Sequence, residues 1–255
     1  MSAEILSKAK LKELKSLSSK KERDSRGLFL AEGHKCVVDM LEHFRLFNLI
    51  CTPAWIEAHP SEAEKYYDRI LTTDKRGMEI ISSLNSLPDV IAVFCKPEGL
   101  TQIPKVDDKK LYLLLDEIQD PGNLGTIIRT CDWFGIYQIF ASTTTVDAFN
   151  AKVVQASMGS LSRVSVEYLD LEALIDKNPE IKVIGTLLDG VSLKEVKNID
   201  AGFLLMGNEG KGISEALKRR INVPVTIMPS NPFQHPDSLN VAIATAIALY
   251  HLRQV

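Results

Sequence analysis

Three short polar segments in the second half of the chain hold the residue types that could do chemistry. The first reads DPGNLGTIIR (120–129) and carries Arg129 into an otherwise apolar stretch. The second reads MGNEGKGIS (206–214), and its glycines would let the backbone approach a ligand closely. The third ends in Ser-Leu-Asn (238–240), just before a long apolar run. Their order along the chain favours one shared ligand site.

Each segment also has an ordinary structural explanation. Asn123 and Ser238 are good helix N-caps, and Arg129 could extend to solvent from a strand–turn–helix corner. The glycines of 206–214 match neither the dinucleotide-binding nor the P-loop spacing, so a nucleotide-binding enzyme is a distant alternative. Asn240 is harder to explain, because an amide inside an apolar helix needs hydrogen-bond partners. It is therefore the stronger pointer to a site.

The elements that must position these segments alternate between strand and helix. Strand-like apolar runs are LYLLL (111–115), IYQIF (136–140), VSV (164–166), KVIGTLL (182–188), FLLM (203–206) and VPVTI (223–227). Helical segments lie around 123–134, 150–160 and 213–221, and from Ser238 to the end. This pattern predicts an α/β domain with a mostly parallel sheet, in which ligands bind beyond the carboxyl ends of the strands.

Two features leave room for a second copy of the chain. The last helix, LNVAIATAIALYHL (239–252), is apolar nearly all round, so it must be buried in the core or against another subunit. We favour the second subunit. Arg129 follows Asn123 by six residues, about 1.7 helical turns, so the two side chains need not meet within one chain.

The first part of the chain predicts a smaller α/β unit. Apolar residues at helical spacing predict a helix over 3–17, and SSKKERDSRG (18–27) reads as a polar turn or loop. Between Lys8 and Arg26 there are eight Lys or Arg against three acids. Such a cluster is typical of a phosphate-backbone contact, and it fits a solvated charged helix equally well.

A break in the alternation marks the domain boundary. Residues 97–108 hold two prolines, a glycine and the start of a charged run, which is typical of a linker. We therefore expect a first domain over 1–96, a linker over 97–108 and a second domain over 109–255.

Composition excludes several protein classes. A hydrophobic content of 45% and a charged content of 25% argue against a disordered or fibrous chain, and a net charge of −3 argues against a generally basic nucleic-acid binder. The sequence has no apolar run long enough to span a membrane and no secretory leader pattern. The four cysteines form no CxxC pair and the histidines show no metal spacing, so we expect buried thiols, no metal site and a cytoplasmic protein.

The three polar segments closely resemble the motifs of the SpoU (TrmH-like) family of RNA ribose 2′-O-methyltransferases, in the SPOUT class. The matching stretches are DPGNLGTIIRTCDWFG (120–135), FLLMGNEGKGIS (203–214) and SLNVAIATAI (238–247). Residues 10–41 also resemble the family's ribosomal-protein-like substrate-binding domain. The resemblance thus covers nearly the whole chain.

The resemblance implies a trefoil knot in the second domain, a bound S-adenosylmethionine and a homodimer. The cofactor would be held largely by backbone groups, at Thr186, Leu187, Gly207, Ile227 and Leu239. In a dimer, Arg129 could complete the partner's pocket. The third segment departs from the family between Ile227 and Ser238, because SNPFQHPD (230–237) is longer than usual and lacks glycine.

The resemblance also implies roles in catalysis. The catalytic residues would be Arg129, Asn123, Glu209, Ser238 and Asn240. The family proposal gives Arg129 the activating role. Because arginine is effectively always protonated, we interpret Arg129 instead as an electrostatic clamp on the developing alkoxide and the adjacent phosphate. Asn123 would position the ribose or Arg129, Glu209 would hold Asn123 or the arginine, and Ser238 and Asn240 would line the reacting centre.

The expected substrate is structured RNA, most plausibly ribosomal RNA, with Lys20, Lys21 and Arg23 contacting its phosphates. Two alternatives stay open at this point. One is methylation of transfer RNA, and the other is a non-catalytic RNA-binding protein that keeps the fold.

Overall fold

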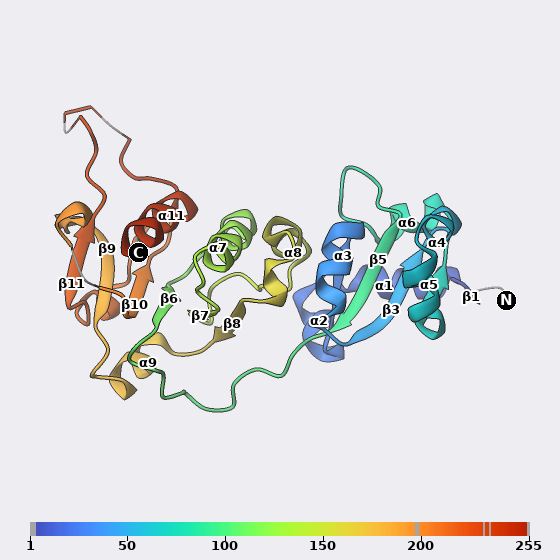
Figure 1. Cartoon of the computed structure of the whole chain (residues 1–255), viewed down its shortest axis with the longest axis horizontal. Coiled ribbons are helices and arrows are strands. Elements are labelled where there is room, and N and C mark those ends of the chain that lie inside the picture. Colours follow the sequence, from blue (N-terminus) through green and yellow to red (C-terminus); the bar gives the residue numbers. More distant parts are fainter. Residues whose placement is uncertain (1–3, 197–198, 232, 235, 254–255) are drawn as a thin grey trace. The chain divides into compact units, whose positions relative to one another are not determined.

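The computed structural model describes residues 4–196, 199–231, 233–234 and 236–253. The chain forms two compact units (Figure 1). Unit 1 comprises Met1–Glu98 together with Asp147–Ser162, and unit 2 comprises Gly99–Val146 together with Arg163–Val255. Asp147–Ser162 thus belongs to unit 1, although the chain on both sides of it belongs to unit 2.

Unit 1 is built on a five-stranded sheet with the order β1-β4-β3-β5-β2. The strands are β1 (Glu4–Ile5), β2 (Leu28–Glu32), β3 (Leu46–Cys51), β4 (Ile70–Thr72) and β5 (Val90–Cys95). Its helices are α1 (Lys8–Ser16), α2 (Lys20–Arg26), α3 (His34–Leu41), α4 (Pro53–Ala58), α5 (Pro60–Lys65), α6 (Lys75–Ile81) and α8 (Ala151–Ser157), with short 3-10 turns η1 (Tyr67–Arg69) and η2 (Ser160–Ser162). The strand and helix content confirms the expected small α/β unit.

The first helix is shorter than its sequence pattern predicts. Ser7 caps α1 by accepting a hydrogen bond from the backbone N–H of Lys10, so the helix begins at Lys8 rather than at residue 3. Glu4–Ile5 instead forms β1, which pairs in parallel with β4. The apolar stripe of α1 continues to Leu17 and packs into the core with Leu11 and Leu14.

The segment 18–27, which we expected to be a turn or loop, contains the helix α2. Its residues are almost all polar, so no apolar stripe announces it. Its one buried side chain is Arg23.

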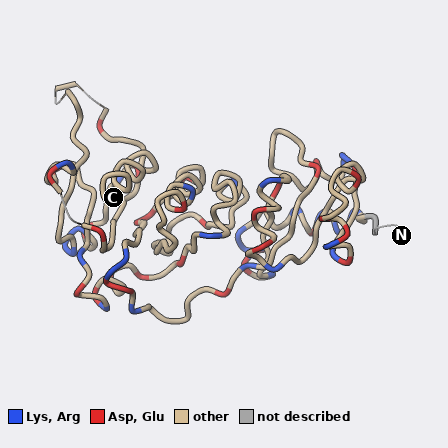
Figure 2. The backbone as a smooth tube through the Cα atoms, in the orientation of Figure 1, with Lys and Arg blue, Asp and Glu red and all other residues tan. Residues whose placement is uncertain are grey.

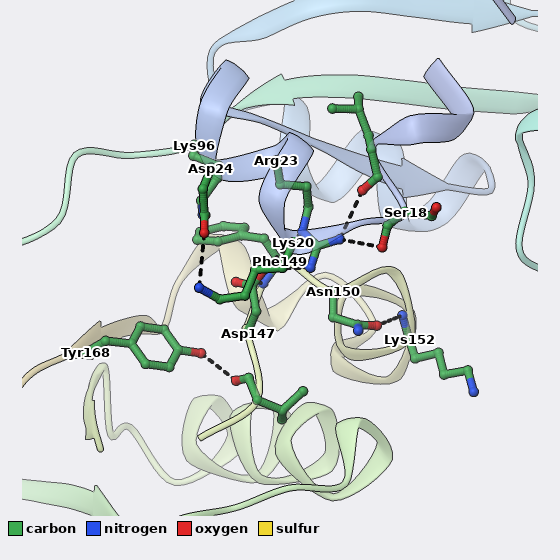
Figure 3. Close-up of polar contacts among 12 residues, drawn as sticks. Ser18, Lys20, Arg23, Asp24, Lys96, Asp147, Phe149, Asn150, Lys152 and Tyr168 are labelled. Carbon is green, nitrogen blue, oxygen red and sulfur yellow. Dashed lines mark hydrogen bonds and ion pairs between the residues drawn. The ribbon is translucent and has the colours of Figure 1, made fainter. Parts of the chain in front are cut away.

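Segment Asp147–Ser162 completes an aromatic cluster in unit 1. The Phe149 ring lies 4.7 Å from that of Phe29, which also contacts Phe44 at 5.1 Å and Phe94 at 5.7 Å between ring centroids. The Lys96 ammonium lies over the Phe149 ring (Figure 3). This part of the core of unit 1 is therefore closed by a residue that is distant in sequence.

Unit 2 has a six-stranded sheet with the order β11-β9-β10-β6-β7-β8, and every neighbouring pair is parallel. The strands are β6 (Leu111–Leu115), β7 (Gln138–Ala141), β8 (Ser165–Tyr168), β9 (Val183–Ser192), β10 (Gly202–Met206) and β11 (Val223–Thr226). The helices are α7 (Pro121–Trp133), α9 (Leu171–Lys177), α10 (Glu215–Lys218) and α11 (Val241–Leu252), with η3 (Leu193–Glu195). The predicted parallel α/β sheet is confirmed.

The central strands of unit 2 are buried on both faces, as helices on the two sides of a parallel sheet require. The helices α7 and α11 lie side by side (Figure 1). The knotted threading of the chain stays a prediction. Within the described ranges, no helix has the length and apolar character needed to cross a membrane.

Candidate functional site

The first polar segment begins α7 with an aspartate rather than an asparagine cap. Asp120 accepts a hydrogen bond from the backbone N–H of Asn123 at 2.8 Å, and Pro121 occupies the first turn, where its missing N–H does no harm. The expectation that Asn123 is the cap is therefore corrected. The amide of Asn123, one turn into the helix, is free to make other contacts.

A chain of hydrogen bonds joins the three polar segments through that amide. Asn123 Nδ2 donates to Glu209 Oε1 at 3.0 Å, and Asn240 Nδ2 donates to Asn123 Oδ1 at 2.9 Å. We call this arrangement the amide relay. It brings together three of the five residues that the sequence predicts to be catalytic.

The direction of the amide relay follows from its anchored end. Asn240 Oδ1 accepts from the backbone N–H groups of Ala242 and Ile243, so its Nδ2 must be the group that faces Asn123. Asn123 therefore presents its oxygen to Asn240 and its nitrogen to the Glu209 carboxylate. Since each amide orientation is set by the next, the relay has only one consistent arrangement of donors and acceptors.

The cap of the last helix also differs from expectation. Asn240, not Ser238, is the N-cap of α11, and α11 begins at Val241. Asn240 is accordingly exposed rather than buried in an apolar helix. Ser238 lies just before the cap and is exposed.

The glycine-rich segment folds onto itself and not around a phosphate. Asn208 and Gly212 exchange two backbone hydrogen bonds, of 3.0 and 2.9 Å. Asn208 Oδ1 also accepts from the N–H groups of Gly210 and Lys211, which a phosphate cradle would need to leave free. A Cβ on Gly207 would lie 2.4 Å from the Gly212 carbonyl carbon, so this glycine permits close backbone packing.

The segment before α7 is held rigidly against the glycine-rich segment. The Asp116 carboxylate is only 4% exposed and accepts from the Ser214 N–H at 2.8 Å, while the Glu117 carbonyl accepts from Asn208 Nδ2. Glu117 adopts a positive φ of 57°, which is rare for a residue with a side chain. Such strain persists only where surrounding contacts impose it.

Sequence reasoning missed two further residues that support this segment. Ser142 Oγ accepts from the Glu117 N–H, and Thr145 Oγ1 accepts from the Ile118 N–H. Both come from the run STTT (142–145) directly after β7. The sequence did contain a signal for these two residues, which is a cluster of hydroxyl side chains right after a buried parallel strand.

Arg129 lies away from the amide relay. The exposed stripe of α7 consists of Gly122, Thr126, Arg129 and Trp133, spaced at helical intervals. Within the described part of the chain, the Arg129 guanidinium has no hydrogen bond or ion pair. Arg129 is therefore exposed and has no hydrogen bond to the relay of the same chain.

Two of the residues predicted to hold a cofactor follow the carboxyl ends of strands, and two others lie inside the neighbouring strand β9, level with the end of β10. Thr186 and Leu187 are in β9, Gly207 follows β10, Ile227 follows β11, and Leu239 precedes α11. Thr186 Oγ1 donates to the Leu205 carbonyl at 3.3 Å. The side chains of Leu188, Met228 and Leu239 are exposed in the same segments. Backbone groups beside exposed apolar side chains fit a ligand with a nucleoside and an aliphatic arm.

The predicted RNA contact needs correction at Arg23 (Figure 3). Arg23 is 2% exposed, its Nε and Nη2 donate to Asp147 Oδ2 at 2.9 and 2.7 Å, and its Nη1 donates to the carbonyls of Leu17 and Ser18. A guanidinium enclosed in this way cannot reach an RNA phosphate. Lys20 is exposed and pairs with Asp24 at 3.0 Å, and Lys21 is exposed.

Two known families match successive parts of the chain. Residues 8–92 match the MRM3-like substrate binding domain, and residues 110–250 match the SpoU rRNA Methylase family. The Bacillus subtilis 23S rRNA (guanosine(2553)-2'-O)-methyltransferase RlmP is 33% identical over 250 residues, which is 96% of each chain.

Solved structures agree with these matches over the full length. A TrmH-family protein from Porphyromonas gingivalis has 37% identity, a TM-score of 0.83 and coverage of 98% of both chains. An AdoMet-bound rRNA methyltransferase from Sinorhizobium meliloti has 29% identity and a TM-score of 0.87, over 99% of this chain and 98% of that one. With its fold, its motif segments and its sequence in agreement, this chain belongs to the SpoU rRNA methylase family.

Proposed function

We propose that this protein transfers a methyl group from S-adenosylmethionine to the 2′-hydroxyl of a ribose in ribosomal RNA. The observation that carries the proposal is the amide relay, which links the three family motifs beside the carboxyl ends of the parallel strands. The relative from Bacillus subtilis, similar over 96% of this chain, is named for the same reaction on 23S rRNA.

The cofactor would be held by Thr186, Leu187, Gly207, Ile227 and Leu239. S-adenosylmethionine, when bound, supplies a methyl group on a positively charged sulfur. The exposed Leu188, Met228 and Leu239 would cover the apolar parts of the ligand. No metal ion is required for this chemistry, because the sulfonium already makes the methyl group electrophilic.

Arg129 would act on the ribose hydroxyl. The hydroxyl is a weak acid, so the reaction needs its developing negative charge stabilised. A guanidinium remains charged at neutral pH and can bind the alkoxide and an adjacent phosphate oxygen together. We therefore assign Arg129 to charge stabilisation and the amide relay to positioning. Ser238, two residues before the relay's Asn240, would line the reacting centre.

The arginine of one subunit would serve the pocket of another. Arg129 shares its exposed stripe on α7 with Trp133, whose side chain is 85% exposed. The neighbouring α11 contains no Lys, Arg, Asp or Glu (Figure 2) and exposes Ile243, Ile247 and Tyr250 at helical spacing. A contiguous apolar surface of this kind is typical of a subunit interface, and a twofold dimer would bury it.

We place the activity in the cytoplasm. The four cysteines are free thiols, three of them buried, as expected for a protein kept in a reducing compartment. The methylated RNA would there be an intermediate of ribosome maturation.

The proposal is tested by methyl transfer from isotopically labelled S-adenosylmethionine to unmodified transcripts of large-subunit ribosomal RNA and of transfer RNA. We expect label in the ribosomal RNA, on a ribose oxygen. Label found only in the transfer RNA would show that transfer RNA, not ribosomal RNA, is the substrate. RNA binding without any label would favour the non-catalytic alternative.

Variants of Arg129 separate its two possible roles. Arg129→Ala should lower the rate of transfer about a hundredfold or more, as expected for the loss of a charge-stabilising donor. Arg129→Lys keeps the charge and loses the planar pair of donors, so it should stay well below wild type. Full activity of the lysine variant would contradict the clamp. Arg219→Ala, at the exposed end of α10, is the matched control.

A further inference from the structure

One edge of the sheet in unit 1 collects the ends of four strands. β1 and β3 both run parallel to β4, and β5 is antiparallel to β3 and to β2. β2 therefore runs in the same direction as β1, β3 and β4. The segments that follow these four strands emerge at the same edge, which we call the carboxyl edge of unit 1.

Basic residues follow three of these four strands. Lys8 comes after β1, Lys35 after β2, and Lys75 and Arg76 after β4, and all four are exposed. None of them forms a salt bridge with another described residue. Lys8 and Lys35 stand in the first turns of α1 and α3, which have no acidic residue there. A positive charge at that end of a helix is unfavourable, so helix stability does not explain them.

Three acidic residues at this edge already accept hydrogen bonds within the fold, whereas the exposed Glu57 of α4 has no such partner among the described residues. Glu32, at the end of β2, is buried and accepts hydrogen bonds from Ser82 and Ser83. Asp74 caps α6, and Asp89 accepts from Thr52 Oγ1. Lys8, Lys35, Lys75 and Arg76 have no ion pair with a described residue and are available to contact an anionic ligand.

Several basic residues on and next to α2 are arranged differently, although the exposed Lys21 has no ion pair with a described residue. Lys20 and Lys96 share Asp24, and Arg26 pairs with Glu13 and Glu22. Their charges are largely neutralised within the fold. In unit 1, more basic side chains without an ion pair to a described residue lie at the carboxyl edge than on α2.

Three aromatic rings stand at the same edge, after β2 and β3. His34 is the first residue of α3, and Trp55 and His59 lie four positions apart, on and just after α4. The imidazole rings of His34 and His59 are stacked, with centroids 4.0 Å apart and planes inclined by 15°. The Trp55 ring lies 4.9 Å from that of His59. We call these three rings the ring platform.

A hydrogen bond orients His34 within the ring platform. Trp55 is buried, and its Nε1–H donates to His34 Nδ1 at 3.3 Å. That bond requires an unprotonated Nδ1, so the neutral His34 carries its proton on Nε2. The His34 side chain is exposed, yet it is held by this bond and by stacking. Gly33, with a φ of +88°, makes the turn that brings His34 to the edge.

We propose that the carboxyl edge of unit 1 binds the RNA substrate, with an unpaired nucleobase stacked on His34 and His59 and the flanking phosphates contacted by Lys8, Lys35, Lys75 and Arg76. Flat rings stack on bases that are not in a duplex, and free cations bind phosphates. This inference rests on the proposed function, because it names how unit 1 holds the RNA that unit 2 modifies.

The ring platform is tested by binding of the full chain to a single-stranded RNA oligonucleotide and to a duplex of the same sequence. His34→Ala and His59→Ala should each weaken binding of the single strand about five- to tenfold, the lower part of the range for loss of a stacked base. Binding of the duplex should change far less. His34→Phe keeps a stacking ring and should restore most of the affinity. Equal affinity of wild type and both alanine variants for the single strand would overturn the platform.

The basic edge is tested by charge reversal at Lys35 and Lys75 together. Affinity should fall for both RNAs, and the slope of log affinity against log salt should lose about 0.7–0.9 for each phosphate contact removed. Arg45→Glu and Arg69→Glu reverse exposed charges before β3 and β4, at the opposite edge, and should leave the slope unchanged. His43→Ala, at the other end of α3, is the control for the histidine variants. An unchanged slope in the Lys35 and Lys75 variant would overturn the phosphate role.

Methyl transfer to the ribosomal RNA transcript is measured on the same proteins. If wild type methylates RNA while all edge variants bind and methylate as wild type does, the inference on unit 1 fails and the proposed function stands. If wild type binds RNA through this edge but transfers no methyl group, the proposed function fails instead. Photocrosslinking of a nucleobase to His34 or His59 would support the platform directly, and crosslinks found only elsewhere would contradict it.

Discussion

At Asn123 a single amide faces a carboxylate on one side and another amide on the other. The amide nitrogen can only donate and the amide oxygen can only accept. The amide relay therefore requires the nitrogen to face Glu209 and the oxygen to face Asn240. The buried Asp116 accepts a hydrogen bond from the Ser214 backbone N–H, and the carbonyl of the strained Glu117 accepts one from the Asn208 side chain. The site is thus rigid before a ligand arrives, which is what positioning a weak nucleophile requires.

Replacing Asn123 by aspartate should be worse than replacing it by alanine. Asn123→Ala removes two hydrogen bonds, whereas Asn123→Asp also turns a carboxylate toward the Glu209 carboxylate and repels it. Misplacement of this kind costs about a hundredfold in rate, so initial rates of methyl transfer should fall in the order wild type, alanine, aspartate. Asn85→Asp, in an exposed loop, is the matched control. An aspartate variant as active as the alanine variant would contradict the relay.

The cysteine thiols should differ in reactivity according to burial. Burial raises the pKa of Cys36 and of Cys51 to about 12, and it also raises the pKa of Cys131. A raised pKa keeps each thiol protonated and unreactive at pH 8. Iodoacetamide at pH 8 should therefore modify the half-buried Cys95 first, as read by mass spectrometry of peptides, and should modify all four cysteines only after denaturation. Early labelling of Cys131 would contradict the packing.

At the level of elements, sequence periodicity was sufficient for the parallel sheet but not for every helix start. Buried strands are read from apolar runs, so the strands of unit 2 were predictable. The caps were not, because Asp120 and Asn123, like Ser238 and Asn240, are equally good capping residues within one turn of each other. The helix α2 was missed for a different reason: its buried residue is Arg23, whose partner Asp147 lies 124 positions away.

The ion pair between Arg23 and Asp147 should be needed for the stability of unit 1. Arg23→Met leaves the Asp147 carboxylate buried without its cation, which should lower the free energy of unfolding by about 3–5 kcal/mol. The double variant Arg23→Met with Asp147→Leu removes both charges and should recover much of the loss. Urea unfolding curves measure both effects.

The control is Arg26→Met, which breaks exposed pairs and should cost about 1 kcal/mol or less. A loss for Arg23→Met no larger than this would show that the buried pair contributes little. A double variant as unstable as the single one would show that the side chains matter for more than their charge.

At the level of the whole molecule, the exposed apolar side chains on α7 and α11 are the basis of the proposed dimer. Ile247→Asp should convert the proposed dimer into a monomer, because it places a charge at the centre of that surface, and activity should fall with it. Sedimentation velocity measures the change. Ile80→Asp alters a similarly exposed isoleucine in unit 1 and should leave the oligomeric state unchanged.

A mixture of two inactive variants tests whether subunits share a site. Arg129→Ala and Asn123→Asp proteins, dissociated and reassociated together, should regain activity at about a quarter of the sites if each pocket takes its arginine from a twofold-related partner. Independent sites would stay inactive in any mixture.

The discontinuous composition of unit 1 has a consequence for biosynthesis. Phe29, Phe44 and Phe94 are translated long before Phe149, the ring that completes their cluster, and Arg23 long before its counterion. A nascent chain therefore emerges from the ribosome with an apolar gap that its first ninety-eight residues cannot close. These residues therefore stay incompletely folded, and accessible to chaperones, until Ser162 has left the exit tunnel.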